Sequence, residues 1–184
     1  MTGKPLLKII YCGVRYNYYK PRLGLSFEHI NFYTSLSRLP GFEVMYYPFD
    51  RILEVGKRRF NEELLDLVRK EQPALVFAFM LSDEFDCETL EKLKKLTTTA
   101  AWFADDSWRF YNYSRRWARH FSWAVTTYSW MPDLYRRAGQ KQVIRSQWAA
   151  DPKTYKPTGP GPGPDVSFVG GWSRPREKII SALR

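Results

Sequence analysis

Six short runs of β-branched and aromatic residues recur along the chain, and they constrain its fold more than any other feature. The runs occupy residues 6–11, 43–47, 74–81, 99–104, 123–127 and 142–146. Segments with helical spacing or turn residues lie between them. Strands that alternate with helices are typical of βαβ units around a parallel sheet. The sequence therefore predicts an α/β fold whose mainly parallel sheet is covered by helices on both faces.

Helix start and stop signals fit between these runs. Ser26 is a suitable N-cap for a first helix, which residues 40–41, Pro-Gly, would end. A second helix would end at Pro73, and Asp86 can cap a third. The run at 74–81 is apolar on both faces, which is typical of a central strand with helices above and below it.

The composition changes abruptly near Pro157. Residues 156–164 contain no apolar side chain and alternate Pro with Gly, which indicates a linker. A strand-like run at 166–169 and a helical start near Arg176 follow. We expect a domain over 1–150, a hinge and Pro/Gly linker over 151–164, and the first strand and helix of a truncated second domain over 165–184. The alternative is that this last segment adds to the first sheet.

The composition indicates a folded protein of the cytoplasm. Aromatic residues make up 17% of the 184 residues, which excludes a disordered chain. Cys12 and Cys87 are too few and too far apart for a disulfide framework or a zinc site, so a reducing cytoplasm is expected. No apolar run reaches the roughly 18 residues of a spanning helix, so we expect a soluble protein.

The charge is concentrated in the second half of the chain. Residues 101–184 carry 14 Lys and Arg against 6 Asp and Glu, within a net charge of +10 for the whole chain. A field of this sign attracts an anionic ligand, a nucleic acid or an acidic membrane surface. The charge alone does not choose among these partners, and an ordinary basic surface is the alternative.

Two adjacent carboxylates, Asp105 and Asp106, follow the fourth apolar run and are hemmed by aromatic residues. Burial and the nearby like charge both disfavour ionisation, so at least one of the two is expected to have a raised pKa, as a general base requires. The pair could instead hold a divalent metal, although no further carboxylates are evident nearby. In the structural alternative, one aspartate caps the next helix and the other pairs with Arg109.

The loop after the first strand, residues 12–24, is long, basic and aromatic. Ligands of open α/β sheets bind outside the carboxyl ends of the strands, so this loop is a candidate binding surface. It contains neither the dinucleotide nor the P-loop glycine pattern. Its tyrosines and cations suit a carbohydrate or a nucleotide, while packing of Tyr16, Tyr18 and Tyr19 against neighbouring loops is the alternative.

Six longer sequence segments resemble those of a known family: WFADDSWRF, WAVTTYS, SQWAADPKTYKP, DVSFVGGWSRPREKIISALR, KIIYCGVRYNY and SFEHINFYTSL. They resemble the amino-terminal portion of the CgeB-like (spore maturation protein) glycosyltransferase family, and the resemblance covers nearly the whole chain. The family implies the GT-B fold, in which two Rossmann-like domains face each other. The amino-terminal domain mainly holds the acceptor, and the carboxyl-terminal domain holds the nucleotide-sugar.

The resemblance also assigns expected roles to the end of the chain. Residues 151–157 are similar to the hinge of related transferases, although the Pro/Gly insertion at 159–164 departs from a compact hinge. Four residues match the first glycine-bearing loop of a donor domain, which in such enzymes faces the donor phosphates: Gly170, Gly171, Arg174 and Arg176. The resemblance therefore implies that they bind the donor phosphates. A glycine turn that leads into a helix end favours an anion.

The resulting expectation is the acceptor-side part of a GT-B glycosyltransferase, which moves a sugar from a nucleotide-sugar to an unidentified hydroxyl of a sugar, lipid-linked or protein acceptor. Asp105 or Asp106 would accept or orient the hydroxyl proton, Arg109 would fix the carboxylate, and the cleft would be lined by Gly13, Arg15 and Tyr16.

The nucleotide-sugar is expected as co-substrate, with no further cofactor and no metal. The missing carboxyl-terminal domain is the expected protein partner, so the chain alone is expected to be inactive. No nucleic-acid partner is expected, and peripheral contact with an anionic membrane is a further expectation. The alternative is a non-catalytic Rossmann-like module that binds an anionic ligand or polyanion.

Overall fold

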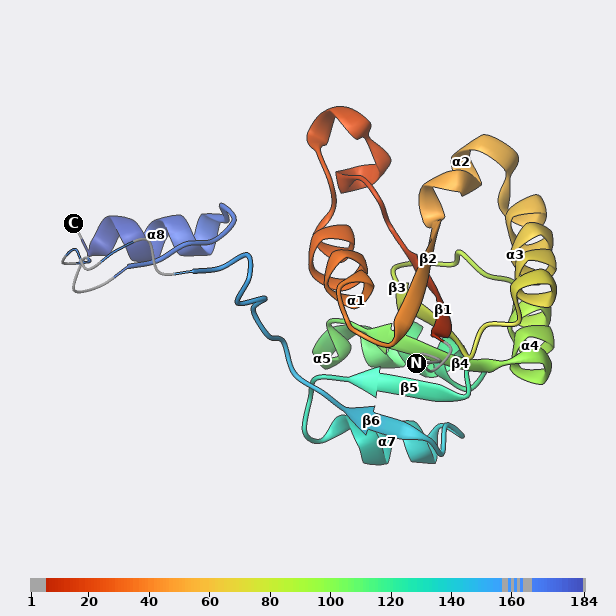
Figure 1. Ribbon diagram of the computed structural model, residues 1–184. Coiled ribbons are helices and arrows are strands. Elements are labelled where there is room, and N and C mark those ends of the chain that lie inside the picture. The colour runs from red at the N-terminus through yellow and green to blue at the C-terminus, as the bar shows by residue number, and fades with distance from the viewer. Residues whose placement is uncertain (1–5, 157–158, 160, 162, 164–166, 184) are drawn as a thin grey trace. The chain divides into compact units, whose positions relative to one another are not determined.

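The computed structural model describes residues 6–156, 159, 161, 163 and 167–183 (Figure 1). The chain divides into two compact units, Met1–Thr154 and Tyr155–Arg184. This boundary falls within the range predicted as hinge and linker, 151–164. Each unit is described by itself below.

The first unit is built on a six-stranded parallel sheet, and a strand forms at each predicted apolar run. The strands are β1 (Leu7–Gly13), β2 (Phe42–Pro48), β3 (Leu75–Met80), β4 (Thr98–Phe103), β5 (Trp123–Thr126) and β6 (Val143–Arg145). Their order in the sheet is β2-β1-β3-β4-β5-β6, and every pair is parallel. The predicted α/β, Rossmann-like class is thereby confirmed, and β3 is central as its two apolar faces indicated.

Helical segments connect successive strands. Between β1 and β3 these are η1 (Asn17–Tyr19), η2 (Pro21–Leu23), η3 (His29–Tyr33), α1 (Thr34–Ser37), η4 (Phe49–Arg51), α2 (Ile52–Val55) and α3 (Lys57–Glu71). The later connections contain α4 (Cys87–Leu96), α5 (Asp106–Arg109), η5 (Phe110–Ser114), α6 (Arg115–Ala118) and α7 (Met131–Arg137). None of the helices in the described part of the chain is long and apolar enough to cross a membrane.

The capping predictions have mixed outcomes. Ser26 does cap its helix, because its Oγ accepts a hydrogen bond from the backbone N–H of His29 at 3.0 Å. Gly41 then turns the chain with a φ of 86°. Asp86 stands directly before α4, but its side chain makes no capping bond and lies 3.4 Å from Lys57 Nζ instead. A neighbouring cation therefore competes successfully for that carboxylate.

Helices cover both faces of the sheet, as predicted. On one face, β-strand residues such as Ile10 and Met80 form the larger core with α3, α4, η5, α6 and α7. On the other face, Tyr11, Phe79 and Trp102 pack against η3 and α1 through aromatic side chains such as Phe32. Figure 1 shows α1 apart from α3 and α4, which lie side by side. The second core is therefore smaller and mostly aromatic.

The second unit contains one helix, α8 (Arg174–Ala182), in its described residues. The predicted helical start near Arg176 falls inside α8. The predicted strand at 166–169 is wrong for its described residues 167–169, which have no regular secondary structure. A strand forms only when a neighbour pairs with its backbone, and the sheet of the first unit is made of residues 7–145. Val166 lies outside the described residues.

Candidate functional site

The topology of the sheet locates one edge for a ligand. The strand order reverses between β1 and β3, so the connections from their carboxyl ends leave in opposite directions and open a crevice there. Two adjoining cavities lie at this edge, of about 330 Å³ and 390 Å³, and Phe27, Glu28 and Leu81 line both of them. We call the two cavities together the carboxyl-edge cleft.

The cleft combines an aromatic wall with two carboxylates. The first cavity is also lined by Phe79, Ala104, Asp105, Arg109 and Trp148. The second is also lined by Val14, Asn17, Tyr18, Tyr19 and Ser26. The loops that follow β1, β3 and β4 therefore all contribute, together with the start of the helix that Ser26 caps. Aromatic rings offer flat apolar faces, and carboxylates accept hydrogen bonds from hydroxyl groups.

Strained backbone is concentrated at this cleft. Four described non-glycine residues have a positive φ, and three of them line it: Tyr18 at 53°, Tyr19 at 59° and Asp105 at 61°. The fourth, Gln72, ends α3. Large side chains rarely adopt this conformation, and such strain gathers at functional sites. The loop of Tyr18 and Tyr19 is held by Asn17, whose Nδ2 donates to the carbonyl oxygens of residues 23 and 25.

The two predicted catalytic aspartates have different surroundings. Asp106 is fully buried, and its carboxylate accepts hydrogen bonds from Thr126 Oγ1 at 2.7 Å and from the Tyr135 hydroxyl at 2.8 and 2.9 Å. Burial raises the pKa of Asp106, although hydrogen bonds from neighbours that include Ser114 oppose the shift. The expectation that Asp106 contacts an acceptor is therefore corrected: its carboxylate joins α5 to β5 and α7.

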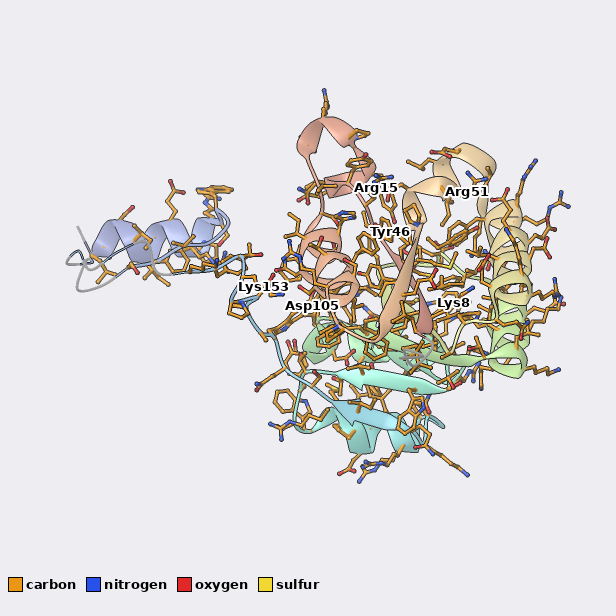
Figure 2. The ribbon with its side chains drawn as sticks, in the orientation of Figure 1. Lys8, Arg15, Tyr46, Arg51, Asp105 and Lys153 are labelled. Atoms are coloured by element: carbon orange, nitrogen blue, oxygen red, sulfur yellow. The ribbon has the colours of Figure 1, made fainter. Side chains whose placement is uncertain are left out.

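Asp105 is the exposed member of the pair and lines the cleft. Its backbone oxygen accepts the N–H groups of Trp108 and Arg109 at the start of α5, but its side chain makes no capping bond. The left-handed conformation at Asp105 turns successive side chains apart, so that one aspartate is buried and the other faces outward. Figure 2 labels Asp105 and also Arg15, which belongs to the loop after β1.

Arg109 does not fix either carboxylate as predicted. Its Nη2 donates to the backbone oxygen of Leu81 at 2.5 Å, and its guanidinium lies 4.0 Å from the centre of the Tyr113 ring. Within the described residues it forms no ion pair with Asp105 or Asp106. Arg109 therefore ties the loop after β3 to the helical segment after β4, and it lines the cleft beside Asp105.

The three residues predicted to line the cleft from the first loop lie beside its lining. Gly13 is buried, and a Cβ there would lie 2.6 Å from the Tyr11 hydroxyl, so this glycine makes room for the ring. The backbone N–H groups of Arg15 and Tyr16 donate to the Asp50 carboxylate at 2.6 and 3.2 Å. These residues anchor the loop, while their neighbours Val14 and residues 17–19 line the second cavity.

A buried carboxylate in the loop after β3 was not anticipated from the sequence. Glu84 is 2% exposed, and its Oε1 accepts the backbone N–H and the hydroxyl of Ser82 at 2.6 and 2.9 Å. Its Oε2 is buried without a hydrogen-bond partner among the described residues. Burial raises the pKa of Glu84. The pKa values of Tyr19 and Tyr113 are also raised, mainly by burial and secondly by the negative charge of Glu84.

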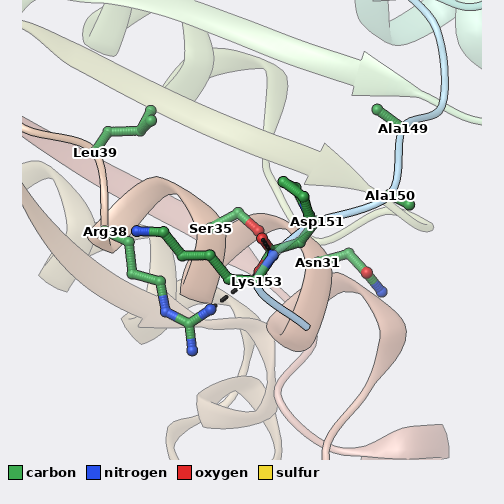
Figure 3. Close-up of a pocket in the computed structure, with 9 residues that line it drawn as sticks. Asn31, Ser35, Arg38, Leu39, Ala149, Ala150, Asp151 and Lys153 are labelled. Carbon is green, nitrogen blue, oxygen red and sulfur yellow. Dashed lines mark hydrogen bonds and ion pairs between the residues drawn. The ribbon is translucent and has the colours of Figure 1, made fainter. Parts of the chain in front are cut away.

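A further cavity, of about 360 Å³, lies between α1 and the segment 149–153 (Figure 3). Arg38 lines it, but Arg38 Nη1 is 3.0 Å from Asp151 Oδ2, so the two charges largely offset each other. Asp151 Oδ1 and Oδ2 also accept hydrogen bonds from Lys153 N and Thr154 Oγ1 at 2.9 Å. The pair of Arg38 and Asp151 fastens the end of the first unit to the residue that follows α1, and the other two bonds hold the turn at residues 151–154. The chemistry of this cavity is less distinctive than that of the cleft.

The predicted phosphate-binding residues all lie in the second unit, before and within α8. Arg176 Nη1 donates to the backbone oxygen of Gly171 at 2.8 Å and lies 5.8 Å from the Phe168 ring centre. A Cβ on Gly170 would lie 2.8 Å from Phe168. Arg174 begins α8, and the preceding residue provides no side-chain cap. The structure brings Gly171 and Arg176 together, and the donor role of these four residues remains a prediction.

The lining residues that sequence reasoning missed include Phe27, Glu28 and Trp148. Phe27 and Glu28 follow the correctly predicted cap Ser26, and this position was a usable signal. Trp148 follows β6 in sequence, yet its ring centre lies 5.3 Å from that of Trp102 and 5.6 Å from that of Phe27. No local pattern places Trp148 at the cleft, because the placement depends on how the chain returns across the sheet.

The described residues contain no group of three or more His, Cys, Asp or Glu side chains that could hold a metal ion. No protein-family model matches this chain, and a comparison with curated proteins gives no match. The resemblance to CgeB-like glycosyltransferases therefore remains a prediction from the sequence strings.

Proposed function

We propose that the first unit is the acceptor-binding part of a glycosyltransferase, with the carboxyl-edge cleft as its acceptor site. One observation carries the proposal: an aromatic wall and two carboxylates share a cleft at the point where the strand order reverses. Sugars present apolar C–H faces to aromatic rings and hydroxyl groups to carboxylates. The resemblance to the CgeB-like family supports the same assignment independently.

The charges of the cleft favour a neutral polyhydroxyl ligand. The first cavity contains two carboxylates, Glu28 and Asp105, and one cation, Arg109, which already donates to a backbone oxygen. An anionic ligand would meet more negative than positive charge there. Its anionic group would also donate no hydrogen bond to a carboxylate, whereas a hydroxyl group does. We therefore assign the cleft to the acceptor and not to the phosphates of a donor.

In the proposed reaction, an acceptor hydroxyl oxygen forms a bond to the anomeric carbon of a nucleotide-sugar. The bond from that carbon to the nucleoside diphosphate breaks, and the diphosphate leaves with the electron pair. Asp105 accepts or orients the hydroxyl proton, because it is the exposed carboxylate of the pair. Glu28 and the wall of Phe27 and Trp148 would hold the acceptor. The donor would bind a domain that includes Gly170, Gly171, Arg174 and Arg176.

Glycan binding by the 184-residue chain tests the proposal. A glycan array would identify ligands, and calorimetry would measure them against matched variants. Asp105→Asn and Trp148→Ala are expected to weaken binding about tenfold or more, since each removes a main contact. Asp133→Asn, an exposed aspartate paired with Arg136, and Trp172→Ala, an exposed tryptophan of the second unit, are the controls. Binding of no glycan, or equal loss in the controls, would contradict the proposal.

The second candidate is a non-catalytic module for a polyanion, which the excess of positive charge after residue 100 favours. The two candidates differ in salt dependence. Binding to a polyanion releases counterions from it, and this release is less favourable at high salt, so the affinity falls steeply as salt is added. Binding of a neutral glycan hardly changes with salt. Titration of the same ligand at low and high salt therefore separates them.

A further inference from the structure

The segment from α5 to α7 carries an exposed row of aromatic rings and arginines. Trp108 is 66% exposed, Tyr111 is 65% exposed and Trp130 is 56% exposed. Arg115, Arg116 and Arg119 are exposed on the same helical stretch. We call these six residues the aromatic–arginine ridge. Single exposed apolar side chains are ordinary on a protein surface, whereas exposed apolar residues gathered in one patch often mark a binding surface.

Contacts and close spacing in the sequence link four of these residues, Trp108, Tyr111, Arg115 and Trp130. The Arg115 guanidinium lies 5.5 Å from the Tyr111 ring centre, and Trp108 precedes Tyr111 by three residues on the helical stretch. Trp130 is linked to the same surface through Tyr128. The rings of Tyr128 and Trp130 have centres 5.1 Å apart, and the Tyr128 hydroxyl accepts from Ser107 Oγ at 3.1 Å.

The ridge is free of negative charge along its own length. The chain has no Asp or Glu between Asp106, which is buried, and Asp133, which pairs with Arg136 at 2.7 Å. The nearest exposed acidic side chains in sequence are Asp105 and Asp133. Arg116 lines a cavity together with Asp83, and Arg119 Nε donates to His120 Nε2 at 3.3 Å. Among the described residues, however, none of the three arginines forms an ion pair, so their charges are available to an external anion.

We propose that the aromatic–arginine ridge is a peripheral docking surface for an anionic membrane. Tryptophan and tyrosine settle at the headgroup level of a bilayer, and arginines beside them attract acidic lipids. A single-stranded nucleic acid would require a groove that follows its backbone. Trp108, Tyr111 and Trp130 do not line the carboxyl-edge cleft. This proposal does not depend on the proposed function.

Co-flotation of the 184-residue chain with vesicles tests the proposal. The chain is expected to float with phosphatidylcholine vesicles that contain phosphatidylglycerol, and not with pure phosphatidylcholine. The triple variant Arg115→Gln, Arg116→Gln and Arg119→Gln is expected to bind about a hundredfold more weakly, since each arginine near an acidic bilayer contributes roughly fivefold. The variant Trp108→Ala with Trp130→Ala is expected to lose the binding that remains at high salt.

A charge-matched control separates the ridge from net charge. The triple variant Arg58→Gln, Arg69→Gln and Lys70→Gln removes three exposed cations from α3 and is expected to keep most of the binding. Thermal melts would confirm that all variants are folded. The proposal is overturned if the control loses as much binding as the ridge variant, or if the wild type ignores acidic vesicles. It is also overturned if the arginine variant loses affinity for single-stranded RNA but not for the vesicles.

Discussion

At the scale of single residues, the neighbouring aspartates 105 and 106 illustrate how one backbone angle separates two roles. Asp105 has a positive φ, so its side chain lines the cleft while Asp106 is directed into the core. Buried carboxylates require donors, and Thr126 and Tyr135 supply them. The sequence predicted that a pKa would be raised in this pair. It did not reveal which aspartate was affected, because the shift comes from burial of Asp106, and burial depends on how distant segments pack around the residue.

Substitution of each aspartate by asparagine distinguishes these roles. Asp106→Asn is expected to lower the free energy of unfolding by about 1–3 kcal/mol, because its amide nitrogen cannot accept from the two hydroxyl groups. Asp105→Asn is expected to change it by less than about 0.5 kcal/mol, since asparagine tolerates a positive φ and the site is exposed. Urea unfolding of both variants measures the difference. Equal unfolding midpoints would contradict the assignment of a structural role to Asp106 alone.

Glu84 provides a test of pH dependence. Burial raises its pKa above the ordinary value of 4.5, so the folded chain holds this proton more tightly than the unfolded chain. The stability that this proton confers is present below pH 4.5 and is lost as the pH rises through the raised folded-state pKa. Glu84→Gln has no such loss. Its free energy of unfolding relative to wild type should therefore increase as the pH rises from about 4 to 7.

The Glu84 prediction has a matched control. Glu62→Gln changes a carboxylate that is 62% exposed on α3, and it should follow the wild-type pH profile closely. Denaturation at several pH values compares the three chains. A difference between Glu84→Gln and wild type that is constant with pH would show that the Glu84 carboxyl keeps an ordinary pKa.

At the scale of elements, the segment after β6 completes the aromatic core on the α1 face of the sheet. Trp148 lies against Phe27, Phe32, Phe79 and Trp102, with ring centres 5.3 to 6.4 Å away. A segment without regular structure is therefore part of the packing, and it also lines the cleft. The helix that Ser26 caps contributes to both features, so cleft shape and local stability are coupled.

Trp148→Ala is expected to lower the free energy of unfolding by about 1–3 kcal/mol, less than the roughly 3–5 kcal/mol of a fully buried tryptophan because Trp148 is half-exposed. Trp172→Ala, at a 79% exposed site of the second unit, should leave the unfolding of the first unit within about 0.5 kcal/mol of wild type. Urea titration followed by circular dichroism checks both. Comparable losses at the two positions would remove Trp148 from the core.

At the scale of the whole molecule, the first unit contains both hydrophobic cores, the complete sheet and the carboxyl-edge cleft. All of these use residues up to Thr154. A chain that ends after Thr154 is therefore expected to unfold within about 0.5 kcal/mol of the 184-residue chain. Urea unfolding of both chains measures this. A clearly lower midpoint for the shorter chain would mean that residues 155–184 stabilise the first unit.

The sequence was sufficient for the architecture but only partly sufficient for the site. Each strand was predictable because apolar β-branched and aromatic runs must be buried in a sheet, and Ser26 was predictable because capping is local. The strand predicted at 166–169 is wrong for the described residues 167–169, because an apolar pattern contains no information about a pairing partner. Glu28 and Trp148 were also missed as lining residues. Their positions depend on contacts between segments distant in sequence.

Nuclear magnetic resonance can locate the ligand site on the first unit. The 184-residue chain would be titrated with a panel of monosaccharides and disaccharides while backbone amide and tryptophan indole signals are followed. Shifts are expected to concentrate at residues 14–19, 26–28, 81 and 104–109 and at the indole of Trp148. Shifts confined to the amino ends of the strands or to residues 167–183, or no shifts with any sugar, would contradict this expectation.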